Sequence, residues 1–481
     1  MKSALFYYPA WRHSLLVCAL VSLGGCASIG TQASIATTTT ASATSPASAP
    51  LVAPERWSQQ SAAPGNATQL AAWWGRFNDP QLSALVLRAL DANTDVSAAL
   101  AALQQSRALR DGQQAALGPT VSATASAQRS TAGTGSSATA SNRFAAGFDA
   151  SWEPDIFGGK RAAVDATQAD ADAALTTLGH VQVSVAAEVA VAYIQLRGYQ
   201  AQLAIAERNL QSQTETAQIV RWRAQAGLTT EVEVEQAATA VAQTAAQIPA
   251  LQTTISTMVH SMAVLTGQTP DALTNALATV QPVPLPQEAL TLSLPADTLR
   301  QRPDVRAAEY QVAAARARVS QAEAARYPGF SLGGTLGLQS LTLGALTDGA
   351  SLVSSLLASV SAPLLDGGAA RATVRAQEAA LAQSYASYRA TVLTALKEVE
   401  DALATLQGDR LRLQQLQAAA DSAQAAATLA SQRYQSGLID FQTVLTTQRT
   451  LLTTQDSVAS ARASVSADHV RLYKALGGGW S

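Results

Sequence analysis

Few residues in this 481-residue chain have side chains that could carry covalent or metal chemistry. The sequence contains four histidines, two cysteines and three methionines. His180, His260 and His469 are too scattered to suggest a set of metal ligands, and the spacing of Met258 and Met262 usually indicates helix packing. The sequence has no P-loop, no GxGxxG motif after a strand and no HExxH pair. It therefore predicts no enzyme, no catalytic residues, no metal and no bound cofactor.

Cys26 is the one residue whose surroundings indicate a covalent reaction. Basic residues precede an apolar run, 15–23, which has the length of a secretory h-region and is too short to be a comfortable membrane span. The run ends in LGGC, residues 23–26, which resembles the bacterial lipobox. That resemblance implies a lipoprotein signal peptide over 1–25, cleavage before Cys26, and a diacylglycerol and an N-acyl chain (palmitate) on this cysteine. An ordinary signal peptide that happens to contain a cysteine is the alternative.

The segment after Cys26 is predicted to be a tether. Cys18 would leave with the signal, so the mature chain would have no disulfide. Ala27 stands where lipoproteins retained in the inner membrane carry aspartate, which favours the outer membrane. The following residues are rich in Ser, Thr, Ala and Pro, so a lipid-anchored flexible linker is expected over 26–70, with order beginning near Trp73.

Composition limits the classes of partner and of fold. The net charge is −2 and no basic run of the kind that binds phosphates occurs, so no nucleic acid partner is predicted. Aromatic residues make up only 5% of the chain and charged residues 14%, while alanine is very abundant. Small side chains in such numbers favour closely packed helices over a core of large aromatic residues.

The chain repeats itself at a spacing of about 210 residues. Asp95 matches Asp304, Pro119 matches Pro328, and the glycines in AGLTTEVEV and SGLIDFQTV match each other. Several landmarks in the same order indicate an internal duplication. The predicted organisation is a first repeat over 71–270, a linker over 271–300, a second repeat over 301–476 and a C-terminal tail over 477–481.

Each repeat has the same predicted order of elements. A helix of roughly 30 residues ends at a proline, two short strands follow, and a Gly-Gly pair opens a long helix that breaks at AGL or SGL and returns. Residues 163–223 form one uninterrupted helical pattern, which at 1.5 Å per residue would be about 90 Å long. In the second repeat the apolar residues of the long helix follow the spacing of a coiled coil: Leu396, Val399, Leu403, Leu406, Leu413 and Leu416.

The strands have one apolar and one polar face. They are expected at 120–128, 143–152, 329–340 and 350–362, and alternation of this kind and length suits transmembrane β-strands. Four strands cannot close a barrel, and an open sheet edge is not tolerated in lipid. The sequence therefore predicts a mainly α protein with membrane β, in which three copies form a 12-stranded barrel with four strands from each chain, continued by a long α-helical barrel.

These segments together resemble the TolC-like outer-membrane efflux channel family, and specifically its lipoprotein branch of OprM and NodT-like proteins. The resemblance covers nearly the whole chain from Trp73 and is carried by WWGRFNDPQLSAL, WEPDIFGGKRAA, LPADTLRQRPDVRAAE, AARYPGFSLGG and RYQSGLIDFQTVLTTQRTLL. It implies a homotrimer in the outer membrane that extends into the periplasm, with 271–300 as an equatorial linker.

The resemblance also implies a function. The expected role is the outer-membrane channel of a tripartite efflux system, a passive conduit for small molecules such as drugs and toxic compounds. A periplasmic membrane-fusion adaptor and an inner-membrane pump, of the proton-driven RND type, would be its partners. A type I protein-secretion conduit and a non-conducting envelope tether are the alternatives, and the sequence does not name the substrate.

Site residues follow from the same resemblance. The helix-to-helix turns would form the periplasmic tip that docks the adaptor, which assigns Gly227, Leu228 and Thr229 in the first repeat and Gly437, Leu438 and Ile439 in the second. Glycine at such a turn supplies a left-handed helix end. Asp421 is the only acidic residue between Asp409 and Asp440 and is the candidate for a charged periplasmic gate. A solvated aspartate on a helix surface is the alternative.

Overall fold

The computed structural model describes residue 57 and residues 72–133, 139–286 and 299–478, all within one unit that runs from Pro50 to Ser481. The predicted signal peptide, Cys26 and most of the predicted linker lie outside the described residues.

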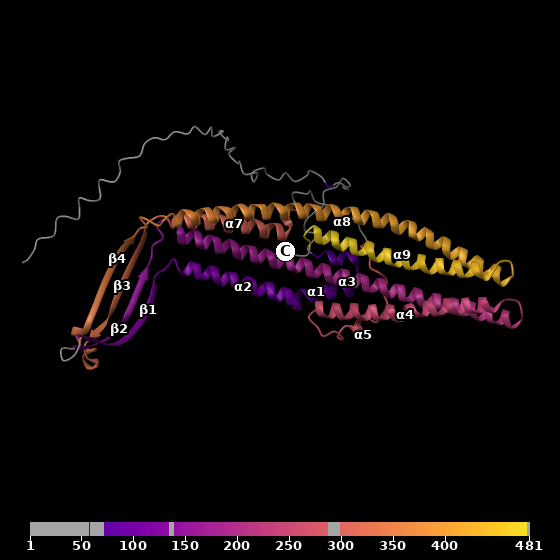
Figure 1. Ribbon diagram of the computed structural model, residues 1–481, viewed down its shortest axis with the longest axis horizontal. Helices are drawn as coiled ribbons and strands as arrows, with labels where there is room; N and C mark the ends of the chain where they lie inside the picture. Colours follow the sequence, from indigo (N-terminus) through magenta and orange to yellow (C-terminus); the bar gives the residue numbers. More distant parts are fainter. Residues whose placement is uncertain (1–56, 58–71, 134–138, 287–298, 479–481) are drawn as a thin grey trace, which may run out of the picture. The chain divides into compact units, whose positions relative to one another are not determined.

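Helices and strands follow the predicted order in both repeats (Figure 1). The first repeat contains η3 (Trp73–Phe77), α1 (Pro80–Ala92), α2 (Thr94–Ala115), β1 (Thr120–Ala132), β2 (Thr139–Trp152), α3 (Gly159–Gln225), α4 (Glu231–Leu265) and α5 (Thr274–Leu277). The second contains α7 (Pro303–Ala324), β3 (Gly329–Ser340), η5 (Leu343–Ala345), η6 (Gly349–Ser351), β4 (Leu352–Ser361), α8 (Ala369–Gln435) and α9 (Phe441–Ala475).

The internal duplication is confirmed by the lengths of the helices. Helices α2 and α7 have 22 residues each, α3 and α8 have 67 each, and α4 and α9 have 35 each. The predicted first helix of about 30 residues is instead two helices, because Asn93 adopts an extended conformation between them. The Asn93 side chain caps α2 by accepting hydrogen bonds from the backbone N–H groups of Asp95 and Val96.

The Gly-Gly pairs open the two long helices, as predicted. Gly158 and Gly368 occupy the N-cap positions with φ of +79° and +91°, in the left-handed region that favours glycine. Asp155 accepts hydrogen bonds from the backbone N–H groups of Lys160 and Arg161, and Asp366 does the same for Ala370. Each long helix therefore begins with a carboxylate over its first free N–H groups.

The four strands form one antiparallel sheet in the order β1-β2-β3-β4. Its two faces differ, as the alternation predicted. Hydroxyl groups pair across strands on one face, with Ser331 and Ser359 joined at 2.6 Å and Thr335 and Ser355 at 2.7 Å. Phe148 and Leu336 are paired on the other face. Among the described strands, β1 and β4 are bonded on one side only, so they are the edges of the sheet.

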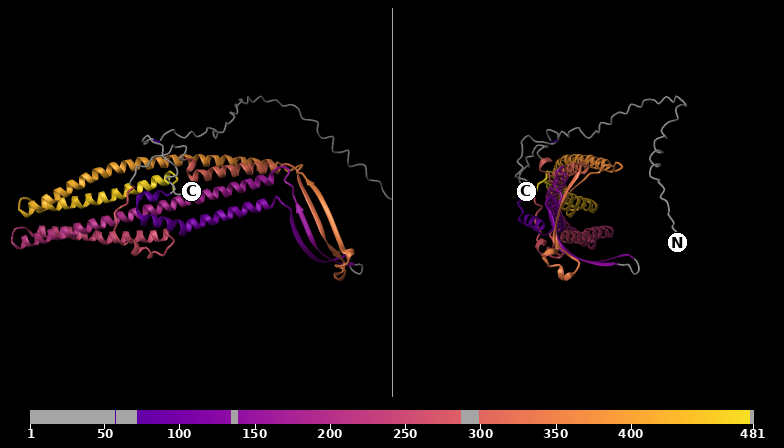
Figure 2. Two further views of the ribbon diagram at one scale, coloured as in Figure 1. Left: turned by 180° about the vertical axis from the view of Figure 1, so that it is seen from behind. Right: turned by 90° about the vertical axis from the view of Figure 1, so that its left-hand side faces the viewer.

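The helices lie side by side in the same order as the strands, from the first repeat to the second. Next to the sheet, α3 packs against α2 and α7, and α7 packs against α8. Farther along, α3 packs against α4 and α9, and α9 packs against α8 (Figures 1 and 2). In the sheet and along the helices, an element of the first repeat (β1, α2 or α4) therefore forms one edge, and β4 or α8 forms the other. Of the described helices, only α3 contains a stretch long and apolar enough to cross a membrane, and half of that stretch is buried within the chain.

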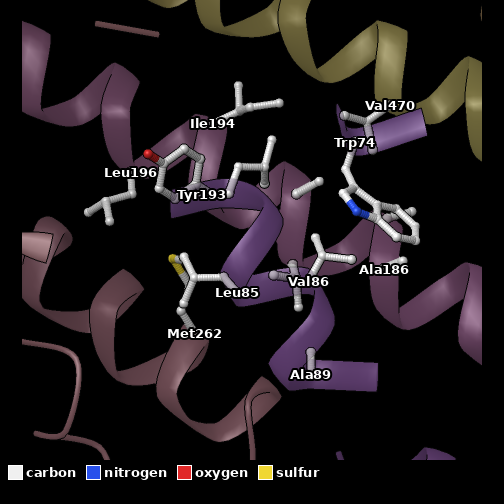
Figure 3. Packing of buried hydrophobic residues seen from close by; sticks show 14 of the residues in the cluster. Trp74, Leu85, Val86, Ala89, Ala186, Tyr193, Ile194, Leu196, Met262 and Val470 are labelled. Carbon is white, nitrogen blue, oxygen red and sulfur yellow. The ribbon is translucent and has the colours of Figure 1, made fainter. Parts of the chain in front are cut away.

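The largest apolar core lies where α1 crosses α3 and α4. Figure 3 shows Leu85 and Val86 of α1 among Tyr193 and Ile194 of α3 and Met262 of α4. A buried polar group fixes this crossing. Arg197 of α3 is fully buried and donates hydrogen bonds to the Oε1 atoms of Gln200 and Gln81 and to the carbonyl oxygen of Thr279. These bonds attach α1 and the segment after α5 to the long helix.

One residue of the predicted linker departs from expectation. Trp57 is only 3% exposed and packs against α8 and α9, although the segment 26–70 is expected to be free. The composition of this segment is that of a tether, but a single tryptophan supplies enough apolar surface to anchor it.

Gly198 and Gly112 provide a matched test of helix packing. A Cβ atom on Gly198 of α3 would lie 2.8 Å from the Cβ atom of Ala463 on α9, whereas one on Gly112 would meet nothing within 4 Å. We expect Gly198→Ala to lower the free energy of unfolding by about 1–3 kcal/mol through overpacking. Gly112→Ala should raise it by up to about 1 kcal/mol through helix propensity. Urea unfolding of the detergent-extracted protein checks the opposite signs, and a stabilising Gly198→Ala would contradict the close contact.

His469 gives the fold a pH dependence. Burial, together with Arg410 and Arg76, lowers the pKa of His469 to about 4, and its Nε2 lies 2.9 Å from Nη2 of Arg410. The unfolded chain takes up a proton on this imidazole near pH 6.5, while the native state stays neutral down to about pH 4. The free energy of unfolding should therefore fall as pH falls from 6.5 to 4.

The variant His469→Gln isolates this contribution. We expect the stability advantage of the unmodified chain over the variant to shrink by about 1–2 kcal/mol between pH 7 and pH 5. Urea unfolding of both proteins at the two pH values measures the change. An advantage that is the same at both pH values would rule out a neutral buried imidazole.

Candidate functional site

The two helix-to-helix turns have the same backbone geometry. At the first turn, the N–H of Gly227 donates to the carbonyl of Ala224 at 2.9 Å and the N–H of Leu228 donates to that of Arg223 at 2.8 Å. At the second, the N–H of Gly437 donates to the carbonyl of Tyr434 and that of Leu438 to Arg433 at the same two distances. This pair of bonds is the Schellman motif, and both glycines have the φ of +73° that it requires.

The structure divides the six predicted tip residues into two groups. Leu228 is 68% exposed and Leu438 is 73% exposed, so neither makes the apolar contact that often accompanies this motif. Thr229 instead donates a hydrogen bond to Glu233 at the start of α4, and Ile439 packs against the apolar cluster between the hairpins. The two glycines shape the turns, and the two leucines are the side chains available to a partner.

A cluster near the turns joins the two hairpins and was not predicted from the sequence. The Nη1 atom of Arg223 on α3 donates to the carbonyl oxygen of Tyr434 on α8 at 2.6 Å, and its guanidinium lies 4.6 Å from the centre of the Tyr434 ring. The Tyr434 hydroxyl donates to Glu233 of α4 at 3.5 Å. Burial, and next the charge of Glu233, raise the pKa of Tyr434 above its ordinary value.

The sequence signal for this cluster is a difference between the two repeats. Tyr434 occupies the position of Ala224 in the first repeat, three residues before the turn glycine, so the two copies differ there. Phe441 packs beside Tyr434 with ring centres 5.7 Å apart, and Val220 and Val444 complete the same cluster. The contact is therefore made once in each chain, between the hairpin α3–α4 and the hairpin α8–α9.

The predicted gate residue, Asp421, is exposed on α8. Three residues farther along α8, Gln424 accepts a hydrogen bond from Nε2 of Gln455 on α9 at 3.1 Å. The Oε1 atom of Gln455 in turn accepts a hydrogen bond from Nδ2 of the buried Asn209 on α3 at 3.0 Å. These hydrogen-bonded amides connect α8, α9 and α3 close to Asp421.

The histidines His180, His260 and His469 lie on three different helices, α3, α4 and α9. Within residues 72–133, 139–286 and 299–478, no three His, Cys, Asp or Glu side chains are placed to hold a metal ion. His469 is buried against Arg410, which disfavours a cation there. Met262 is fully buried and Met258 packs against the same core, so the methionine pair serves packing.

Comparisons with known proteins agree with this architecture. The sequence profile of the family described as "Outer membrane efflux protein" matches residues 85–268 and 294–478, one match for each repeat. The chain is 32% identical over 447 residues to the pyoverdine export outer membrane protein OpmQ of Pseudomonas aeruginosa, covering 89% of this chain and 92% of that protein. It is 30% identical over 431 residues to nodulation protein T of Rhizobium leguminosarum, covering 89% and 88%.

Solved structures give the same result. The outer-membrane channel OprN shares 34% sequence identity with this chain and superposes with a TM-score of 0.82, covering 89% of this chain and 99% of that one. The outer membrane protein VceC of Vibrio cholerae shares 26% identity with a TM-score of 0.78. Both repeats, the four-stranded sheet and the long hairpins are thus those of known channels, and the chain belongs to the outer membrane efflux protein family as a channel component of efflux pumps and not an enzyme.

Proposed function

We propose that three copies of this chain close into one conduit that carries small molecules from the periplasm to the exterior. The observation that carries the proposal is the common order of elements at every level. The sheet presents β1 and β4 as edges, and the helices present α2 or α4 on one side and α8 on the other. Edge β4 of one copy can therefore bond β1 of the next, while α8 packs against the neighbour's α2 and α4.

The choice of small molecules is supported by the relatives. OpmQ is named for pyoverdine export, and a protein of Pseudomonas putida that is 31% identical to this chain is named for toluene efflux. The conduit itself is passive, and an inner-membrane pump supplies the energy. We assign the exposed Leu228 and Leu438 at the turns to the surface that docks a periplasmic adaptor. The same docking tip includes Gly227, Thr229, Gly437 and Ile439.

Two further assignments belong to this proposal. Acylation of Cys26 would attach the N-terminal segment to the outer membrane, in addition to the membrane strands. Asp421, repeated three times around the axis, would place a ring of carboxylates in the wall near the periplasmic end, where it could select or repel charged solutes. Its exposed position on α8 supports this role.

The experiment that tests the proposal measures mass and conductance on one preparation. Protein extracted in detergent from isolated outer membranes of palmitate-labelled cells should have a native mass near three protomers and carry the label. The same material should conduct ions in planar bilayers. In Cys26→Ala we expect a trimer without label, because the strands provide membrane insertion. A monomer would contradict the shared barrel, and a trimer without conductance would leave the envelope tether as the function.

The tip assignment predicts a loss of efflux without a loss of stability. Leu228→Asp combined with Leu438→Asp places charge on two exposed apolar side chains, so the fold has little to lose. We expect drug resistance to fall to the level of cells that lack the channel, while the amount of trimer in the outer membrane is unchanged. Val280→Asp, at a residue after α5 that is 60% exposed and lies on neither edge, is the control and should keep resistance. Full resistance in the double variant would remove the turns from the docking surface.

A further inference from the structure

Trp57 fills an apolar groove between α8 and α9. The tryptophan is 3% exposed, and the groove consists of residues from both helices of the second repeat: Val399, Leu403, Leu406, Val465, Leu472, Ala475 and Leu476. A buried tryptophan removes a large apolar area from water, more than any other side chain could at one position. The contact is therefore the strongest apolar attachment that a single residue of this segment could make.

The first repeat contains the same groove with a different occupant. Val399, Leu403, Leu406 and Leu472 correspond, at an offset of 210 residues, to four fully buried residues of the first repeat: Val189, Tyr193, Leu196 and Met262. There the groove is covered by helix α1 through Leu82, Leu85 and Val86 (Figure 3). Among the described residues, Trp57 packs on these positions of the second repeat as α1 packs on their counterparts in the first.

The N-terminal segment approaches α9 at two places. Trp57 packs with Leu472, and Trp73 stacks on Tyr473, the next residue of α9, with ring centres 5.3 Å apart. Residues 58–72 therefore connect two tryptophans that hold the same turn of α9. The last helix of the chain is secured at that turn by residues from the beginning of the described chain.

A lipid on Cys26 is compatible with this attachment. Thirty residues lie between Cys26 and Trp57, and an extended chain of that length spans up to about 100 Å. Leu403 in the groove lies 34 positions along α8 from Ala369, which is next to the sheet, and this corresponds to about 50 Å. The chain between Cys26 and Trp57, when extended, is therefore long enough to reach the membrane from the groove.

We propose that Trp57 is a latch that seats the N-terminal segment in the α8–α9 groove and completes the second repeat. Trp57 then divides the predicted segment 26–70 into the residues that precede it, from Cys26, and the residues that follow it, toward Trp73. A connection from Trp57 to the membrane rests on the proposed lipidation of Cys26. The latch itself rests only on the burial of Trp57 and the correspondence of the two grooves.

Trypsin provides a direct test, because Arg56 is the only lysine or arginine between Cys26 and Arg76. In the folded full-length protein, the peptide bond from Arg56 to Trp57 should be cleaved slowly. Trp57→Ala should release the segment and raise the cleavage rate at least about tenfold, since proteolysis follows local opening. Gel and mass analysis of the released N-terminal fragment measures the rate, and peptides of the sequence 51–63 with Trp or Ala at position 57 correct for the preference of trypsin.

Two further variants separate the latch from general effects. Leu403→Ala leaves the cleavage sequence intact and enlarges the groove, so it should also accelerate cleavage at Arg56. Trp222→Ala removes a tryptophan of α3 that is 60% exposed, and it should change nothing. Trimer content is checked on every sample, so that a folding failure is recognised. Equal corrected rates in the unmodified protein, Trp57→Ala and Leu403→Ala would overturn the latch, whatever the outcome of the conductance experiment.

Discussion

The unpaired strand edge is the constraint on which the rest of this structure depends. A backbone N–H or C=O without a partner costs several kcal/mol in lipid, so an open sheet cannot remain in a membrane. Among the described strands, β1 and β4 are each bonded on one side. If these edges bond to the edges of other copies, the helices that continue from the strands must also meet the helices of those copies. Helix α8 leaves from β4 and forms one edge of the wall, and α2 and α4 form the opposite one.

Closing a single-layer wall of helices requires that its members approach closely, which explains the composition. Interaxial distances depend on the side chains at the contact, and alanine and glycine permit the shortest. The approach of α3 to α9 at Gly198 and Ala463 leaves no room for even a Cβ atom on the glycine. Large side chains gather at a few places: Trp73, Tyr193 and Tyr473 are fully buried at the crossing of α1, and Tyr434 and Phe441 pack together near the turns. The scarcity of aromatic residues therefore reflects a wall of closely packed helices with a few local clusters of larger side chains.

The parts of the structure with local signals could be predicted from the sequence. The long helix expected at 163–223 is found at Gly159–Gln225, the strand expected at 329–340 is found at Gly329–Ser340, and both turns have their glycines where the pattern placed them. The contacts that hold these elements together could not be predicted. Arg223 and Tyr434 are 211 residues apart and Arg197 and Thr279 are 82 apart, and neither pair has a pattern of its own. Trp57 was hidden by the tether-like composition around it.

The places where the two repeats differ explain how a duplicated chain serves a ring with three copies. Hairpins within a chain and hairpins of neighbouring chains meet at two kinds of joint, and identical repeats would make these joints identical. Tyr434 in place of Ala224 gives the joint within the chain a ring beneath the Arg223 guanidinium and a hydroxyl that donates to Glu233. In the proposed trimer the joint between chains would bring α8 of one copy to α4 of the next, away from this cluster. Divergence at this one position is therefore enough to distinguish the joint within the chain from the joint between chains.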